Sequence, residues 1–373
     1  MIETTAEVLD FFRSRTLRFT LQIETLRPLF YNRSLRLLFL FVLAATVLLS
    51  LSLAFPLWVL LIGPLVYGVP HIFSSIRYFH YALSNEKSLN ASSNNSGNNS
   101  KQRRFAFAFI FFILFAVFSY RLFITADYFG VSTPQLSEWK GSSFIELIAT
   151  GVTFILGALI YRKSSSKILA GLFLLLPFVA IYLRFPIETI GAMVLIHNFV
   201  AFAYWIIAAK TSPERRVAWF ALGTTSILTV LIFLGVFDGA YRFIEPAQVL
   251  NFANLSITDT GKLIAPWSQQ EKLWLHACVA FAFGQGLHYF VWLKAIPDQY
   301  HYHEAPTSFR QSWGLLRSDF GKSVAGLLIA LTLGSVIFWS FLEFQQARLI
   351  YFCLASYHGY LEIAGLGLAK QNS

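Results

Sequence analysis

Four histidines stand inside long apolar segments of this 373-residue chain: His71, His197, His288 and His358. An imidazole in hydrocarbon costs on the order of several kcal/mol unless it is satisfied, so each of them is a candidate functional residue. Each is followed two positions later by Phe or Tyr. Neutral imidazole binds transition metals well, and metal binding offsets the cost of burial. The set therefore predicts four metal ligands.

The depths of these histidines support one shared site. The membrane spans expected to carry them lie near 57–81, 187–209, 272–296 and 345–369. In the predicted topology all four run from outside to inside. With a rise of ~1.5 Å per residue, the histidine depths agree within about 10 Å. They can converge near the middle of the bilayer.

Polar and aromatic residues surround the set. Three polar side chains, each one helical turn from a histidine, can accept the second ring N–H and fix the tautomer: Glu362, Ser75 and Gln285. Three aromatic side chains are candidate cavity walls: Tyr67, Trp205 and Trp292. Glu362, which could also bind the metal, and Tyr67 are the predicted catalytic residues.

Iron (Fe²⁺) is the metal we expect, because an all-nitrogen set without thiolate argues against a structural zinc site and leaves positions open for oxygen or substrate. Zinc, copper and haem remain alternatives. A bis-histidine haem would leave two of the four histidines without a role. A proton-coupled transporter would use the same histidines as a relay, and interhelical hydrogen bonding is the structural alternative. His276 lies near the outer end of its span, with no partner histidine at that depth.

The composition indicates an integral membrane protein. Hydrophobic residues make up 56% of the chain and charged residues only 13%, against roughly a quarter charged in soluble proteins. The net charge of +10 comes from residues spread over short loops, as the positive-inside rule predicts, so we expect membrane lipid and no nucleic acid as a partner.

We predict an all-α, polytopic helical bundle with about ten membrane spans and both termini in the cytoplasm. Residues 1–34 form an amphipathic N-terminal arm, and 35–369 form a single transmembrane domain. Within it, 88–101 is a disordered cytoplasmic linker and 239–271 an external loop. The spans are expected near 35–53, 57–81, 105–125, 142–161, 168–184, 187–209, 217–238, 272–296, 321–343 and 345–369.

The second span carries the sequence "YGVPHIFSSIRYF", with Pro64 and Pro70 before His71. Proline interrupts helical hydrogen bonding, which membrane helices tolerate where neighbouring groups compensate. We expect a bent helix that aims His71 at the buried centre. The pair His301 and His303, in a Pro-bounded loop, reads as solvated, and a metal site there is the less favoured interpretation.

The tetrapeptide "GVPH", Gly68 to His71, resembles the Gly-Ile-Pro-His signature of the bacterial Brp/Blh-type beta-carotene 15,15'-dioxygenases. The match covers four residues and carries over His71 alone, and the chain then departs from the family as "IFSSIRYF". The resemblance implies a multi-pass iron oxygenase of the bacterial inner (cell) membrane. Its partners would be O2 and a lipophilic substrate from the bilayer, such as a carotenoid, an isoprenoid or a lipid.

Overall fold

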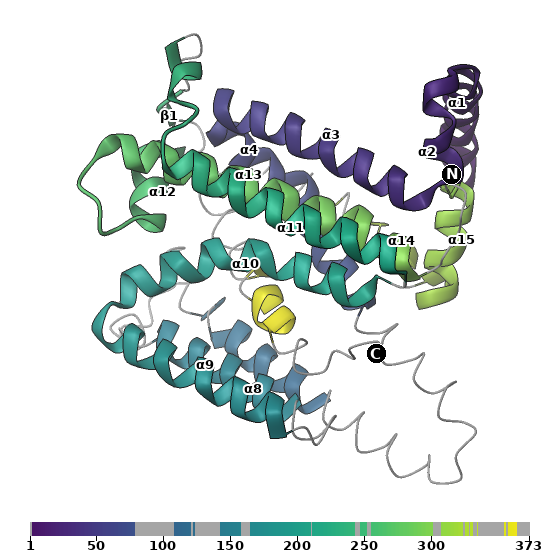
Figure 1. Ribbon diagram of the computed structural model, residues 1–373. Coiled ribbons are helices and arrows are strands. Elements are labelled where there is room, and N and C mark those ends of the chain that lie inside the picture. Colours follow the sequence, from purple (N-terminus) through teal and green to yellow (C-terminus); the bar gives the residue numbers. More distant parts are fainter. Residues whose placement is uncertain are drawn as a thin grey trace, which may run out of the picture.

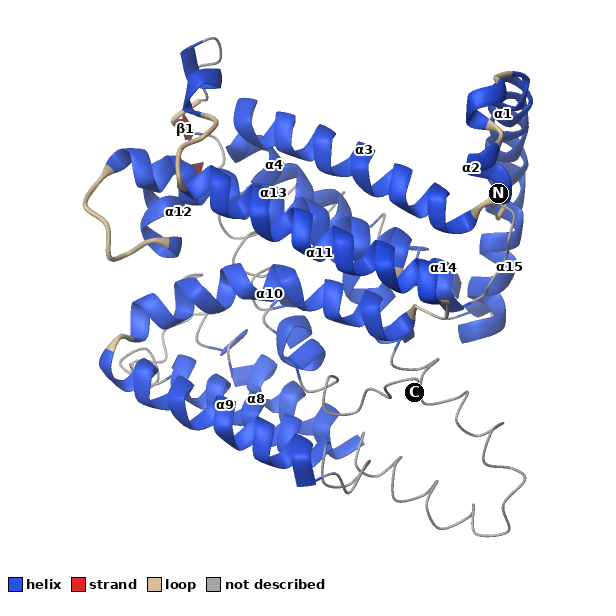
Figure 2. Cartoon of the chain, viewed as in Figure 1, coloured by secondary structure: helices blue, strands red, loops and turns tan. Residues whose placement is uncertain are grey.

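The computed structural model is mostly helical. Figure 2 shows helices throughout, with strands only at one end near β1. The residues that it describes are 2–78, 108–120, 122–123, 142–157, 165–209, 211–242, 247–251, 255–300, 307–323, 325–327, 329–330, 334, 354–355 and 357–363.

The N-terminal arm is helical before the first apolar helix begins. It contains α1 (Ile2–Gln22), η1 (Glu24–Leu26) and α2 (Pro28–Tyr31). Asn32 then caps α3 (Arg33–Ala54) by accepting a hydrogen bond from the backbone N–H of Leu35, as expected of an Asn cap.

The helix that carries His71 begins at Pro56, where α4 (Pro56–Ile62) starts. It continues through η2 (Gly63–Gly68), a π-helical turn, and remains helical to Tyr78. Pro64 lies in this wide turn. A π turn shifts the backbone hydrogen bonds of the helix by one residue, so the missing N–H of a proline can be accommodated there. The irregularity lies where the sequence predicts a bend.

The apolar helix Ala108–Tyr120 comes next, within the span expected at 105–125. It is followed by α8 (Ser142–Gly157), α9 (Ser165–Arg184), α10 (Pro186–Ala208) and α11 (Ser212–Phe233). Proline at the first position of α10 fits the helix start, because its missing N–H would have no partner there. Between α11 and α13 lie η5 (Asp238–Arg242), the short antiparallel strands β1 (Val249–Leu250) and β2 (Leu255–Ser256), and α12 (Ile257–Ile264). Among the described residues, the all-α class thus holds apart from one two-stranded ribbon within the predicted loop 239–271.

The helix α13 (Glu271–Phe290) is the centre of the described fold. It packs against α3, α4, α10, α11 and α12. Consecutive small and apolar residues of α13 are fully buried, including Ala277, Cys278 and Val279. A helix that is apolar on every side belongs in the interior. It continues into η7 (Val291–Ala295), a second π turn, and then into α14 (Pro297–Tyr300).

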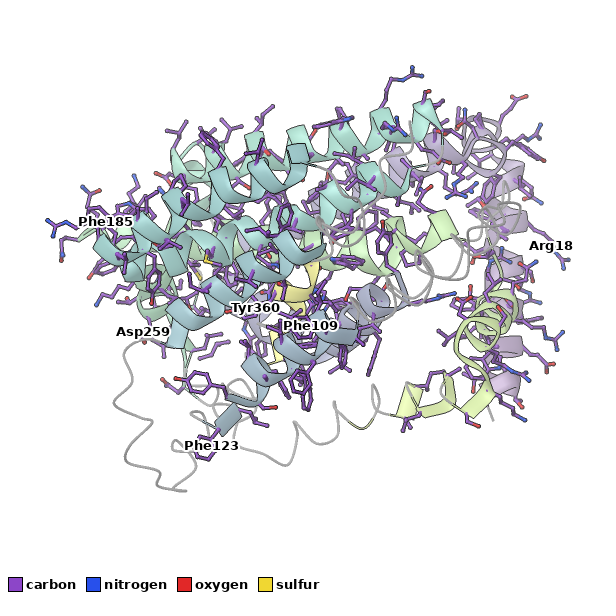
Figure 3. The ribbon with its side chains drawn as sticks, turned by 90° about the horizontal axis from the view of Figure 1, so that it is seen from below. Arg18, Phe109, Phe123, Phe185, Asp259 and Tyr360 are labelled. Carbon is purple, nitrogen blue, oxygen red and sulfur yellow. The ribbon has the colours of Figure 1, made fainter. Side chains whose placement is uncertain are left out.

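Figure 1 shows α3, α13, α11 and α10 running along the same direction, with α8 and α9 on the far side of α10. The helices α1 and α15 (Phe309–Phe320) lie crosswise to them at one end. In the view from below, Arg18 lies at that end, whereas Phe185 and Asp259 lie at the opposite end (Figure 3).

Four helices of the described chain are long and apolar enough to cross a membrane: Arg33–Ala54, Pro56–Tyr78, Gly191–Ala208 and Ser212–Phe233. The predicted spans 321–343 and 345–369 lie largely outside the described residues, as do the linker 88–101 and the pair His301 and His303. The topology of ten spans with cytoplasmic termini therefore stays a prediction.

Candidate metal centre

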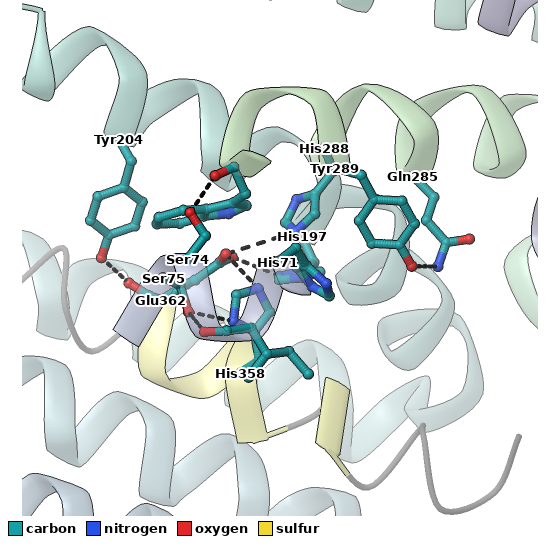
Figure 4. A network of polar contacts seen from close by, with 12 residues as sticks. His71, Ser74, Ser75, His197, Tyr204, Gln285, His288, Tyr289, His358 and Glu362 are labelled. Atoms are coloured by element: carbon teal, nitrogen blue, oxygen red, sulfur yellow. Dashed lines mark hydrogen bonds and ion pairs between the residues drawn. The ribbon is translucent and has the colours of Figure 1, made fainter. Parts of the chain in front are cut away.

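Three helical segments bring potential metal ligands to one buried point. His197 comes from α10, His288 from α13, and His358 with Glu362 from the helical turn 357–363. One ligand atom from each residue lies within 4.8 Å of the other three. Figure 4 shows the carboxylate of Glu362 directed at the histidine rings.

Glu362 is the residue that links the group. Its Oε1 lies 2.7 Å from Nε2 of His358 and 3.8 Å from Nε2 of His288. Its Oε2 lies 3.3 Å from Nδ1 of His197. The Glu362 side chain is fully buried, and an isolated carboxylate in such a place requires a compensating positive charge.

Six polar atoms of this group make no hydrogen bond of good geometry within the described chain. Both oxygens of Glu362, both ring nitrogens of His288, Nδ1 of His197 and Nε2 of His358 have no partner with hydrogen-bond geometry there. Buried polar atoms are nearly always paired, so a cluster of polar atoms without hydrogen bonds needs an explanation. Imidazole nitrogens with one carboxylate are a donor set suited to divalent iron or zinc, and a cation among them would bind one nitrogen of each histidine and the carboxylate.

The tautomer of His358 follows from its neighbour. Ser75 Oγ lies 2.8 Å from Nδ1 of His358 and 2.8 Å from the carbonyl oxygen of Ile72. A hydroxyl has one hydrogen, which is donated to the carbonyl, so Ser75 accepts from the Nδ1–H of His358. The Nε2 lone pair of His358 then faces Glu362. Ser75 thus serves a histidine on another helix rather than His71, its neighbour in sequence.

His71 lies against the cluster, so the structure brings together all four predicted histidines. Its ring centroid is 4.4 Å from that of His358 and 5.4 Å from that of His288. Its Nδ1 lies 3.1 Å from the carbonyl oxygen of Tyr67 and donates to it, which leaves Nε2 unprotonated. The four residues that meet at one point include Glu362 and not His71. A ligand role for His71 stays a prediction.

The two π turns flank two of these histidines, since η2 precedes His71 and η7 follows His288. In η7 the N–H of Ile296 bonds to Val291 rather than to Trp292. The carbonyl of Trp292 is thereby released, and Ser74 Oγ donates to it. This bond joins the His71 helix to the His288 helix. π turns are frequent at functional sites, and the sequence pattern did not reveal either one.

The turn 357–363 approaches α10 closely because residue 359 is glycine. A Cβ on Gly359 would lie 3.3 Å from Cε1 and Nδ1 of His197. The hydroxyl of Tyr204 on α10 donates to the carbonyl oxygen of Glu362. These contacts position Glu362 and His358 against His197.

Aromatic rings extend from the cluster toward the outside. The ring of Tyr289 lies 4.7 Å from that of His71 and 6.2 Å from that of Tyr67. The Tyr67 side chain is 48% exposed, and Tyr289 is buried. Gln285 donates to the Tyr289 hydroxyl at 2.8 Å, so its amide serves this tyrosine instead of His288. The catalytic role assigned to Tyr67 stays a prediction.

Of the two tryptophans predicted to line the cavity, Trp292 lies near the histidines and Trp205 lies among other aromatic side chains. Trp292 lies 6.0 Å from His358 between ring centroids. Trp205 packs against Phe41 and Phe202.

His276 has a separate partner at the other end of α13. Its Nε2 lies 2.7 Å from Oδ1 of Asp238, and Lys272 Nζ lies 2.6 Å from Oδ2 of the same carboxylate. Burial raises the pKa of Asp238, but the hydrogen bonds from Lys272 and His276 outweigh it, so the pKa is lowered overall. This pair satisfies the histidine for which the sequence offered no partner.

Comparison with known proteins adds no further assignment: no protein-family model, curated protein or solved structure matches the chain.

Proposed function

We propose that this chain is a multi-pass membrane protein that holds a non-haem iron ion with His197, His288, His358 and Glu362 and oxidises a lipophilic substrate with O2. The observation that carries the proposal is the convergence of one ligand atom from each of these four residues, three of which are fully buried, with no hydrogen bond of good geometry at either oxygen of Glu362. The resemblance of "GVPH" to the Brp/Blh-type family agrees with it.

The packing of the rings favours a single ion over a haem. Centroids of neighbouring histidines are separated by 4.4 to 5.8 Å, and a porphyrin would have to lie between two of them.

The polar atoms without hydrogen bonds favour a metal over a proton relay. A relay needs donors and acceptors joined in hydrogen bonds, whereas one ligand atom from each of the four residues lies near a common point and the atoms there make no hydrogen bonds of good geometry.

When bound, Fe²⁺ supplies the activation of O2 beside an apolar substrate. The chain supplies the surroundings of that reaction. Glu362 balances part of the cationic charge, Ser75 keeps Nε2 of His358 free to bind, and the buried aromatic side chains exclude water. His71, with its Nε2 unprotonated, is available as a further ligand or as a proton acceptor.

The row from Tyr67 through Tyr289 to His71 is the entrance that we propose for the substrate. It begins at an exposed ring and ends against the cluster. A carotenoid, an isoprenoid or another lipid could enter along it from the bilayer, because such molecules partition into apolar, aromatic-lined surroundings.

Metal analysis of the detergent-purified protein tests the proposal. We expect about one equivalent of iron per chain in the wild type when iron is supplied anaerobically, and a loss of it in Glu362→Gln and His288→Ala. His276→Ala, which removes a buried histidine outside the centre, is the matched control and should keep the metal. Background metal in the wild type, or equal metal in all four proteins, would contradict the proposed site.

Oxygen-dependent turnover is the second part of the test. The iron-loaded wild type and Glu362→Gln should be compared with carotenoids, isoprenoids and membrane lipids under oxygen. Product formed by the wild type alone supports an oxygenase. Metal binding without turnover of carotenoids, isoprenoids or membrane lipids would support the metal site and reject the oxygenase function.

A further inference from the structure

The helix α1 lies crosswise at one end of the bundle, with α15 beside it (Figure 1). One face of α1 packs on the protein. Asp10 accepts hydrogen bonds from the backbone N–H groups of Phe309 at 2.8 Å and Arg310 at 3.0 Å, which caps the first turn of α15. Glu7 pairs with the guanidinium of Arg310. These contacts fix which side of α1 faces outward.

The outward side carries a row of large apolar side chains. Val8, Phe12 and Phe19 recur at helical spacing and are 52%, 61% and 65% exposed. Scattered apolar side chains are normal on a water-exposed surface, but an aligned row of this kind marks an interaction site.

Basic residues border this row and gather at the same end of the molecule. Arg15 and Arg18 are exposed and lie next to the row on the helix. Arg215 and Arg216 stand at the start of α11, which Glu214 joins to the start of α3 through a 2.8 Å ion pair with Arg33. The surface around α1 is therefore both apolar and cationic.

We propose that the outer face of α1 binds the surface of a bilayer that contains anionic lipids. Val8, Phe12 and Phe19 lie in the boundary between headgroups and acyl chains, and Arg15 and Arg18 bind lipid phosphates. An in-plane helix with an apolar row and flanking arginines has the chemistry of an interfacial anchor. The orientation fits, because α1 runs across the end at which the apolar helix α3 begins.

This inference is independent of the metal but depends on the proposed membrane placement of α3. The test therefore probes both helices in one background, with Cys278 and Cys353 replaced by alanine. A bimane label is placed at Phe12→Cys on the outer face of α1, at Leu17→Cys on its opposite face, or at Val47→Cys on the exposed side of α3. The proteins are reconstituted in phosphatidylcholine alone or in phosphatidylcholine mixed with phosphatidylglycerol.

Quenching by aqueous iodide and by a lipid-borne nitroxide reads out the position of each label. We expect the Phe12→Cys label to be quenched by the nitroxide and protected from iodide in the anionic bilayer, and the Leu17→Cys label to be quenched by neither. Each of Arg15→Gln and Arg18→Gln should reduce the fraction of α1 in the bilayer, by about fivefold in the partition constant.

Three results would overturn all or part of the inference. If the Val47→Cys label is in the bilayer while iodide quenches the Phe12→Cys label in both lipid mixtures, the outer face of α1 meets water or a protein partner. If iodide also quenches the Val47→Cys label, the membrane placement fails together with the lipid contact. A Phe12→Cys label in the bilayer whose position is insensitive to phosphatidylglycerol and to the arginine substitutions would reject the anionic-lipid part.

Discussion

At the scale of single residues, the candidate centre depends on groups that orient the ligands. The Nδ1 of His358 is held by Ser75, and the backbone of Glu362 is held by Tyr204. Such partners fix the tautomer and direction of a ligand, so they contribute to metal affinity without touching the metal.

Replacing Ser75 by alanine should weaken metal binding about 10- to 100-fold, because the Nδ1–H of His358 loses its acceptor. Titration of iron into the anaerobic apoprotein measures the change. Ser52→Ala on α3, also fully buried, is the control and should leave the affinity unchanged. Equal affinities for the wild type and Ser75→Ala would mean that His358 does not need this hydrogen bond.

At the scale of elements, close approach of helices decides which side chains can meet. The contact between α12 and α13 depends on Gly261, since a Cβ there would meet the Cβ of Trp274 and lie 2.5 Å from its Cα and carbonyl oxygen. Those are backbone atoms or atoms next to the backbone, so the clash cannot be relieved by a rotamer change.

Gly261→Ala should therefore destabilise the protein by about 1 to 3 kcal/mol, seen as a lower midpoint of thermal unfolding in detergent. Gly223→Ala on α11 is the matched control, because no atom lies within 4 Å of a Cβ at that position. Its unfolding midpoint should be unchanged or higher, since alanine favours helix over glycine. A midpoint for Gly261→Ala equal to that of the wild type would show that α12 can move away from α13 without loss.

The contact between α1 and α15 should depend on pH. Burial raises the pKa of Asp10, but the N–H groups of Arg310 and Phe309 outweigh it and lower the pKa below its ordinary value of 3.8. A carboxyl whose pKa is lower in the docked state stabilises docking above its ordinary pKa. That stabilisation is lost as the pH falls below 3.8 toward the lowered value.

Anisotropy of a fluorophore at Leu17→Cys can follow this docking. We expect a constant value at neutral and mildly acidic pH and a fall in acid as Asp10 becomes protonated. Asp10→Asn keeps the size of the side chain without its charge, so this variant should lose the acid-dependent step. The same step in the variant would assign the transition to another group.

At the scale of the whole molecule, the candidate centre joins segments that are far apart in the sequence. α10, α13 and the turn 357–363 supply its ligands, and the helix of His71 lies beside them. A ligand that binds only the folded state stabilises that state by mass action. Metal binding should therefore be a determinant of global stability.

Supplying Fe²⁺ at 100 times its dissociation constant should stabilise the protein by about 2.7 kcal/mol, read as a rise in the midpoint of thermal unfolding under anaerobic conditions. Glu362→Gln should show no such rise, whereas His276→Ala should show the full rise. A rise of equal size in Glu362→Gln would place the stabilising metal elsewhere.

The sequence alone determined the helical class and several element positions. Spans expected at 35–53 and 187–209 are observed as Arg33–Ala54 and Pro186–Ala208, because length, apolarity and flanking Asn or Pro are local signals. It also selected the four histidines that lie together, since a titratable side chain within an apolar run is conspicuous wherever it occurs.

Only the tertiary structure decided how those residues are paired. It places Glu362 among the candidate ligands, with Ser75 in hydrogen-bond contact with His358 and His276 in contact with Asp238. A helix such as α13 is apolar on all sides, so its sequence carries no periodic signal of the direction in which His288 points. The π turn η2, which precedes His71, changes the direction of that side chain relative to the start of its helix. Depth along a helix can be read from the sequence, but rotation about its axis and the choice of neighbour arise from packing between helices.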